Sequence, residues 1–236
     1  MAAYFELELD GPGKNSLSTP MMESILRRLD EAGDAPLLVS GKGDALSAGL
    51  NLKEVAALDA RGMERFVRLV DELMARLFDH PAPTVACVNG HAIAGGCVLL
   101  LCCDYRVATD APGARVGLNE VALGLVFPPK ILRIVTHRVP PRSVHEVVLR
   151  AALYSPSDAL RLGLVDEVTP DARRRAVERI EELSALPRAA YAATKRALHA
   201  GVTAFDAAAY EAALQATFPA WTSDDIKQRA LAQLRR

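Results

Sequence analysis

The sequence predicts an α/β fold that ends in a helical C-terminal region. Short apolar runs alternate with longer runs of helical period as far as residue 169, and that alternation is typical of an α/β core. Beyond it only helical patterns remain, so we predict a core over 1–169 and a helical region over 170–236. Half of the residues are hydrophobic and 24% are charged, as in ordinary globular proteins.

The N-terminal part is predicted to form a strand, a helix and a second strand. Residues 5–9 alternate apolar and polar side chains, which indicates a strand that a turn closes. Ser18 or Thr19 can cap the helix that follows, whose apolar residues recur on one face over 22–29. Residues 36–40, PLLVS, then predict a short buried strand.

A long helix and a second strand–helix–strand unit come next. From Gly62 the apolar residues keep a helical period until Pro81 ends it. Strand 84–88, an apolar helix from Cys97 and strand 105–108 complete the unit.

Four helices are expected in the C-terminal region, because proline and glycine divide a long helical pattern. Their apolar faces include Tyr210, Leu214 and Phe218, which a small core is not expected to cover fully, and exposed apolar patches usually mark interfaces. We therefore expect a homotrimer or a dimer of trimers. The helices are Ala172–Leu186, Arg188–Ala200, Phe205–Phe218 and Ser223 onward, separated by Pro187, Gly201 and Pro219.

Charge and hydropathy argue against several classes of partner. The net charge of −1 gives no strong field for nucleic acid or an anionic membrane, and the basic run at 173–175 is expected to be a solvated helix face. No stretch has the roughly 20 apolar residues of a membrane span, and the first residues show no signal pattern, so we expect a cytoplasmic protein. No metal site is expected, because the cysteines lack ligand spacing and fit a reduced core; they are Cys87, Cys97, Cys102 and Cys103.

Two loops in the chain carry unusually small side chains. Ala94, Gly95 and Gly96 separate strand 84–88 from the apolar helix, without a nucleotide-binding fingerprint. Close packing or a tight turn would explain them, and so would an anion held by free N–H groups at a helix N-terminus. The second loop, Ser47-Ala48-Gly49-Leu50, also follows a strand. Two such loops could aim two N–H donors at one oxygen, as an oxyanion hole does.

Glu120 is the best candidate for a base beside that oxygen. It is a lone carboxylate in the apolar segment 116–126, although an exposed or capping role would also fit. Burial would raise its pKa toward the range of a general base. Asp104 is expected to be structural and tied to Arg106, and His91 shows no catalytic partner in sequence.

These segments resemble the crotonase, or enoyl-CoA hydratase/isomerase, superfamily. The similarity rests on LSAGLNLKE, VNGHAIAGGCVLLLCCDYRVATD, GLNEVALG and LGLVDEV, in that order, and covers nearly all of the chain. It implies a spiral of β-β-α turns with a C-terminal trimerisation region, acting on acyl-CoA thioesters. It further implies an oxyanion hole on the N–H groups of Leu50 and Gly95, with Glu120 as the base.

Within the superfamily, GLNE, AGGC and the C-terminal end are most similar to mitochondrial-type 3,2-trans-enoyl-CoA isomerases. The resemblance places Val98 where hydratases carry their first glutamate. Pro128 stands where hydratases have a glycine whose N–H helps to hold water, and Phe127 adds bulk beside it. A single base fits a proton shift better than the addition of water.

The resemblance therefore implies an isomerase of fatty acid β-oxidation that converts a 3-enoyl-CoA into a 2-enoyl-CoA. A hydratase, another crotonase reaction, and a non-catalytic CoA- or RNA-binding relative remain alternatives. No cofactor is expected, because coenzyme A is part of the substrate. Candidate phosphate contacts are Lys42, Lys53 and Arg236, and the expected substrate-binding residues are Ala48, Gly49, Asn51, Gly96, Val98, Phe127 and Pro128.

Overall fold

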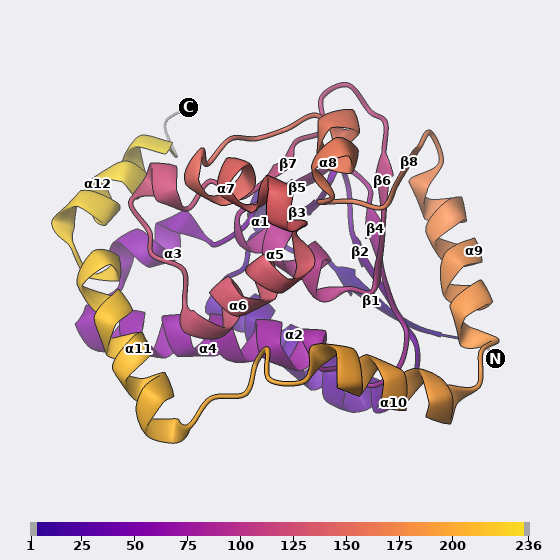
Figure 1. The fold of residues 1–236 in the computed structure, drawn as a ribbon. Helices are drawn as coiled ribbons and strands as arrows, with labels where there is room; N and C mark the ends of the chain where they lie inside the picture. The colour runs from indigo at the N-terminus through magenta and orange to yellow at the C-terminus, as the bar shows by residue number, and fades with distance from the viewer. Residues whose placement is uncertain (1–3, 234–236) are drawn as a thin grey trace.

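Two parallel sheets form the centre of the molecule in the computed structural model, which describes residues 4–233 (Figure 1). The larger sheet has the order β1-β2-β4-β6-β8, and the smaller has the order β3-β5-β7. The strands of the larger sheet are β1 (Phe5–Leu9), β2 (Leu37–Gly41), β4 (Thr84–Val88), β6 (Tyr105–Thr109) and β8 (Glu167–Thr169). Those of the smaller sheet are β3 (Ala45–Ser47), β5 (His91–Ile93) and β7 (Val116–Gly117).

From β2 onward the chain advances as a spiral in which successive strands join alternate sheets. β2, β4 and β6 enter the larger sheet, and each is followed by a short strand of the smaller sheet, namely β3, β5 and β7. The predicted α/β fold and its β-β-α turns are confirmed. The three short strands were not predicted, because two or three residues are too few for an alternating pattern to stand out from a loop.

Helices connect the strands, and the predicted ones form with small shifts at their ends. The Ser18 hydroxyl accepts a hydrogen bond from Met21 N and so caps α2 as expected. The helices before β8 are α1 (Pro12–Asn15), α2 (Thr19–Ala32), α3 (Leu52–Ala57), α4 (Ala60–Phe78), α5 (Gly95–Cys102), α6 (Pro129–Arg138), α7 (Pro141–Leu149) and α8 (Pro156–Leu162), with a 3₁₀ turn η1 (Val121–Leu123).

Both faces of the larger sheet are covered at its inner strands β2 and β4, which explains why these two strands are nearly continuously apolar. One face joins the main core with residues such as Val39 and Ala86. The opposite face presents Leu38, Val85 and Val107 to α9 (Ala172–Ser184), the first helix of the C-terminal region. The C-terminal region thus supplies one layer of the sheet packing.

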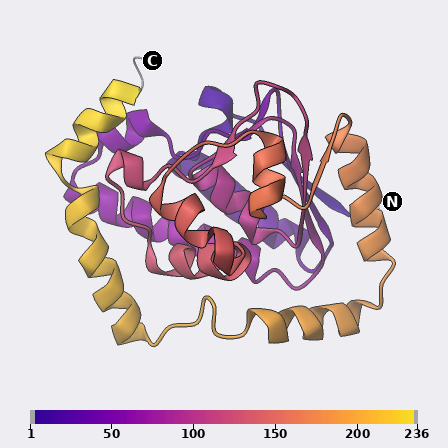
Figure 2. The same ribbon diagram turned by 45° about the horizontal axis from the view of Figure 1, so that its top comes forward.

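The C-terminal helices α9, α10 (Arg188–His199), α11 (Ala207–Trp221) and α12 (Asp224–Gln233) follow one another around the outside of the spiral (Figure 2). Pro219 does not end the third of them as predicted, because it lies inside α11, which continues to Trp221. A proline close to a helix end costs one backbone hydrogen bond, and buried Trp221 packs against the core beyond it.

The core covers the C-terminal apolar face only in part. Leu214 is fully buried, and Tyr210 and Phe218 are half-buried against the same chain's core. The Tyr210 hydroxyl donates a 2.8 Å hydrogen bond to Asp71 of α4. Tyr210 and Phe218 thus keep part of their apolar surface exposed in one chain, and the homotrimer or dimer of trimers stays a prediction.

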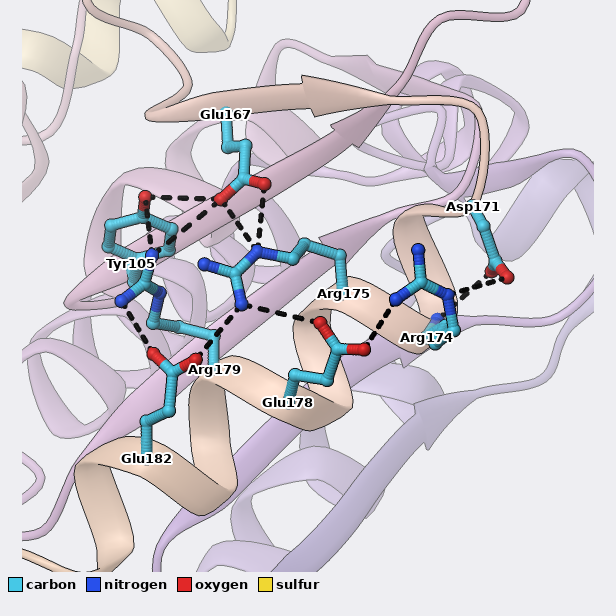
Figure 3. A network of polar contacts seen from close by, with 8 residues as sticks. All are labelled: Tyr105, Glu167, Asp171, Arg174, Arg175, Glu178, Arg179 and Glu182. Carbon is cyan, nitrogen blue, oxygen red and sulfur yellow. Dashed lines mark hydrogen bonds and ion pairs between the residues drawn. The ribbon is translucent and has the colours of Figure 1, made fainter.

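Ion pairs on α9 tie it to the sheet (Figure 3). The Arg175 guanidinium donates to Glu167 of β8 at 2.8 Å, and Arg179 stacks on the Tyr105 ring of β6. Arg174 points away and its side chain is 63% exposed, so the basic run is a solvated face only in part.

Asp104 has a different partner from the predicted one. Lys195 of α10 donates to Asp104 at 2.8 Å, and both side chains are largely buried. Arg106 pairs instead with Asp166, at 2.6 Å. The two partners come from far along the chain, so the neighbouring sequence could not reveal them.

The four cysteines are buried, as predicted, and none of them forms a disulfide within residues 4–233. Burial raises the pKa of the Cys87 thiol to about 11. No helix in that part of the chain is long and apolar enough to cross a membrane. Within the same residues, no cluster of ligand side chains is suited to a metal ion.

We predict that Lys195→Met destabilises the fold by about 3 kcal/mol, because it leaves the buried Asp104 carboxylate without its cation. Arg174→Ala is the control, since exposed ion pairs contribute less than about 1 kcal/mol. Urea unfolding followed by circular dichroism measures both. Equal effects of the two substitutions would contradict a structural role for the Asp104–Lys195 pair.

Candidate active site

An outer cavity of about 450 Å³ lies where the loop after β3, the start of α5 and the loop after β7 meet. It contains four predicted site residues, Ala48, Leu50, Asn51 and Glu120, together with Lys53. A hollow of about 500 Å³ beside α2 and α4 contains no predicted site residue and is lined largely by charged side chains. The outer cavity is further lined by Pro12, Gly13, Ser16, Leu52, Ile93, Ala94, Asn119, Leu123, Leu125 and Leu153.

A much smaller inner cavity, of about 20 Å³, adjoins the outer one. Leu50 and Glu120 line both cavities and so form the boundary between them. The other predicted residues that line the inner cavity are Gly95, Val98, Phe127 and Pro128, and the remaining lining residues are Val70, Ile131 and Trp221.

The other two predicted residues, Gly49 and Gly96, let the two loops approach each other. Gly49 has φ +89°, and a Cβ there would lie 2.6 Å from the Ile93 carbonyl oxygen. A Cβ on Gly96 would overlap the Ser47 carbonyl oxygen. At Gly95 a Cβ would meet only side chains, Leu17 at 3.1 Å and Leu50 at 3.4 Å. Backbone contact therefore requires glycine at 49 and 96 more strictly than at 95.

The N–H groups of Leu50 and Gly95 are available to a ligand. Helix α5 begins at Gly95, two residues earlier than predicted, so the Gly95 N–H lies in the first turn, where no carbonyl of the helix can accept it. On either side of Leu50, Leu17 N donates to Gly49 O and Asn51 N donates to Leu17 O. This pairing leaves the Leu50 N–H without a backbone acceptor in the described part of the chain. Within residues 4–233, neither N–H donates a hydrogen bond to another backbone group.

Glu120 is a buried carboxylate between β7 and η1, only 7% exposed. Its Oε2 atom has no hydrogen-bond partner within the described chain. Burial removes the water that would stabilise its charge and raises its pKa from 4.5 to about 8. Its backbone carbonyl accepts from Leu123 N and Leu125 N, which fixes the turn that holds the side chain at the cavity.

Other candidates are placed less directly at the site. The Asn51 side chain caps α3, accepting from Lys53 N and Glu54 N at 3.1 Å. Lys42 pairs with Asp10 on the surface and lines neither cavity, and Arg236 lies outside the described residues. Half-buried His91 lines neither cavity.

Asn119 and Trp221 are two of the lining residues that the sequence analysis missed. Asn119 lines the outer cavity beside Glu120, and its Oδ1 atom is buried without a partner in the described residues. Trp221 lines the inner cavity from 101 residues further along the chain than Glu120. Trp221 is the single tryptophan of the sequence, and this was the only feature that marked it. The sequence does not show where its ring packs.

Sequence comparison matches residues 2–233 to the family described as enoyl-CoA hydratase/isomerase. The mitochondrial enoyl-CoA delta isomerase 1 of Mus musculus is 35% identical over 170 residues, covering 70% of this chain and 59% of the mouse protein. A putative enoyl-CoA hydratase of Thermus thermophilus is 33% identical over 184 residues, covering 75% of this chain and 70% of that protein. This chain therefore spans less than two thirds of the mouse relative.

Comparison with solved structures gives the same family. The human mitochondrial delta3-delta2-enoyl-CoA isomerase superposes with a TM-score of 0.93 at 26% identity. The match covers 100% of this chain and 94% of the human chain, so it includes the C-terminal helices as well as the spiral.

We predict that Glu120→Gln stabilises the protein, and more so as pH rises. Between pH 4.5 and about 8 the unfolded chain carries an ionised Glu120 while the folded chain holds it protonated, so wild-type stability falls with pH through that window. Glutamine has no such cost. Urea unfolding at about pH 5 and pH 8 should show the advantage of the variant growing by about 3 kcal/mol. A difference independent of pH would contradict the buried, protonated state.

Proposed function

The chain belongs to the enoyl-CoA hydratase/isomerase family, and we propose that it is an enoyl-CoA isomerase that shifts the double bond of a 3-enoyl-CoA to the 2-position. The observation that carries this proposal is the pairing of one buried, unpartnered carboxylate with two free N–H groups beside the same cavity boundary.

The proposed reaction is a proton shift in two steps. The thioester carbonyl oxygen accepts hydrogen bonds from the N–H groups of Leu50 and Gly95, which stabilise negative charge on it. Ionised Glu120 removes a proton from C2, giving an enolate whose charge rests on that oxygen. The protonated Glu120 then returns the proton to C4, and the double bond moves from C3–C4 to C2–C3. Proton and charge balance, and no cofactor is needed.

The site's side chains support an isomerase over a hydratase. Among the residues that the structure describes, Glu120 is the only carboxylate that lines either cavity, whereas hydration needs a water molecule held between two acid/base groups. Val98 offers no proton and no hydrogen bond on the inner side. Pro128 has no N–H with which to hold a water molecule, and Phe127 fills space beside it.

The remaining assignments are proposals of the same kind. The CoA part would occupy the outer cavity, where Lys53 is the only cation that lines the wall within residues 4–233. The role in fatty acid β-oxidation and the homotrimer or dimer of trimers follow from the family resemblance. The cytoplasmic location stays a prediction, and curated relatives include mitochondrial proteins.

We predict clear conversion of 3-enoyl-CoA to 2-enoyl-CoA, with hydration of 2-enoyl-CoA at least about 100-fold slower. Glu120→Gln should lower the isomerisation rate by at least about 100-fold, because a positioned base contributes that much. Both rates can be measured from the absorbance of the conjugated 2-enoyl thioester, which isomerisation of 3-enoyl-CoA increases and hydration of 2-enoyl-CoA decreases. Hydration as fast as isomerisation, or a fully active Glu120→Gln, would show that the assignment is wrong.

The raised pKa of Glu120 predicts a pH dependence. Only the ionised carboxylate accepts a proton, so kcat/KM for isomerisation should rise about tenfold per pH unit below a pKa of about 8 and level off above it. The residual activity of Glu120→Gln should lack this limb. A wild-type profile that is flat between about pH 6 and pH 9 would exclude a buried Glu120 as the base.

A further inference from the structure

The inner cavity is nearly filled, and its walls are apolar except for Glu120. Trp221 closes it from α11, while Val70 of α4 and Ile131 of α6 form other parts of the wall. Its volume of about 20 Å³ accommodates roughly one water-sized group. The outer cavity, at about 450 Å³, is more than twenty times larger.

Trp221 is held firmly in this wall. Its ring is 2% exposed, and its Nε1–H donates a 2.8 Å hydrogen bond to the Val126 carbonyl. Val126 belongs to the segment between η1 and α6, which follows Glu120 in the chain. A ring with its N–H bonded and its faces packed cannot swing aside without losing both, so the closure belongs to the folded state.

The proposed reaction directs the acyl chain toward this wall. The thioester carbonyl lies at Leu50 and Gly95, the CoA part lies in the outer cavity, and C2 to C4 lie at Glu120. Gly95 and Glu120 both line the inner cavity, so carbons beyond C4 continue into it. That space takes about one methyl group before the chain meets the indole ring.

We infer that Trp221 is the residue that determines substrate length, restricting the enzyme to short acyl chains of about five or six carbons. This inference rests on the proposed isomerase function. A chain of ten carbons would have to displace the indole ring or leave part of itself outside the cavity. A misfit of even one methylene in an apolar pocket costs about tenfold or more in kcat/KM.

The test compares kcat/KM for 3-hexenoyl-CoA and 3-decenoyl-CoA. Wild type should prefer the shorter substrate by at least about tenfold, and Trp221→Leu, which opens the wall, should move that ratio at least about tenfold toward the longer one. Trp221→Phe should move it less, in the same direction. Phe218→Leu is the matched control, because it lies one turn earlier on α11, does not line the cavity and should keep the wild-type ratio.

An unchanged ratio in Trp221→Leu, or equal wild-type rates for both substrates, would overturn the inference. If Trp221→Leu does not fold, the ratio in Trp221→Phe decides in its place. Calorimetric binding of saturated hexanoyl-CoA and decanoyl-CoA separates the inference from the proposed reaction. If no substrate of any length is isomerised, the proposed reaction alone is refuted. The length inference then still requires that wild type binds hexanoyl-CoA more tightly than decanoyl-CoA. It also requires that Trp221→Leu reduces this difference in affinity.

Discussion

The site depends on the close backbone contact between the loop after β3 and the first turn of α5. Parallel pairing of β3 with β5 brings these segments to the same end of the smaller sheet. Gly96 then lies against the Ser47 carbonyl, where a Cβ has no room, and a Cβ on Gly49 would lie 3.3 Å from the Gly95 nitrogen. Leu50 and Gly95, whose N–H groups donate to no other backbone group of the described chain, both line the inner cavity.

Glu120 completes the site at a cost to folding. A carboxyl with its pKa raised to about 8 is partly ionised near neutral pH, which suits reversible proton transfer. The desolvation that raises the pKa also lowers stability at neutral pH, since the unfolded chain solvates the ionised group. No cation among the residues lining the inner cavity offsets that cost, which keeps the group basic.

The C-terminal region contributes to both the fold and the cavity. Helix α9 covers one face of the larger sheet through apolar contacts and through ion pairs such as Arg175 with Glu167. Helix α11 continues beyond Pro219, so that Trp221 at its end lines the inner cavity. There the indole N–H donates a hydrogen bond to the segment that follows Glu120. A region that sequence alone separates from the core therefore forms part of the wall of the inner cavity.

Local pattern in the sequence was enough to determine the α/β class, the long helices, and a helix cap at Ser18 or Thr19. Those features depend on periodicity and on side-chain chemistry within a few residues. The short strands β3, β5 and β7, the Asp104–Lys195 pair and the Trp221 wall were decided only by tertiary structure. Each of these features brings together residues that are distant in the chain, and the sequence near one residue does not show which distant residue will contact it.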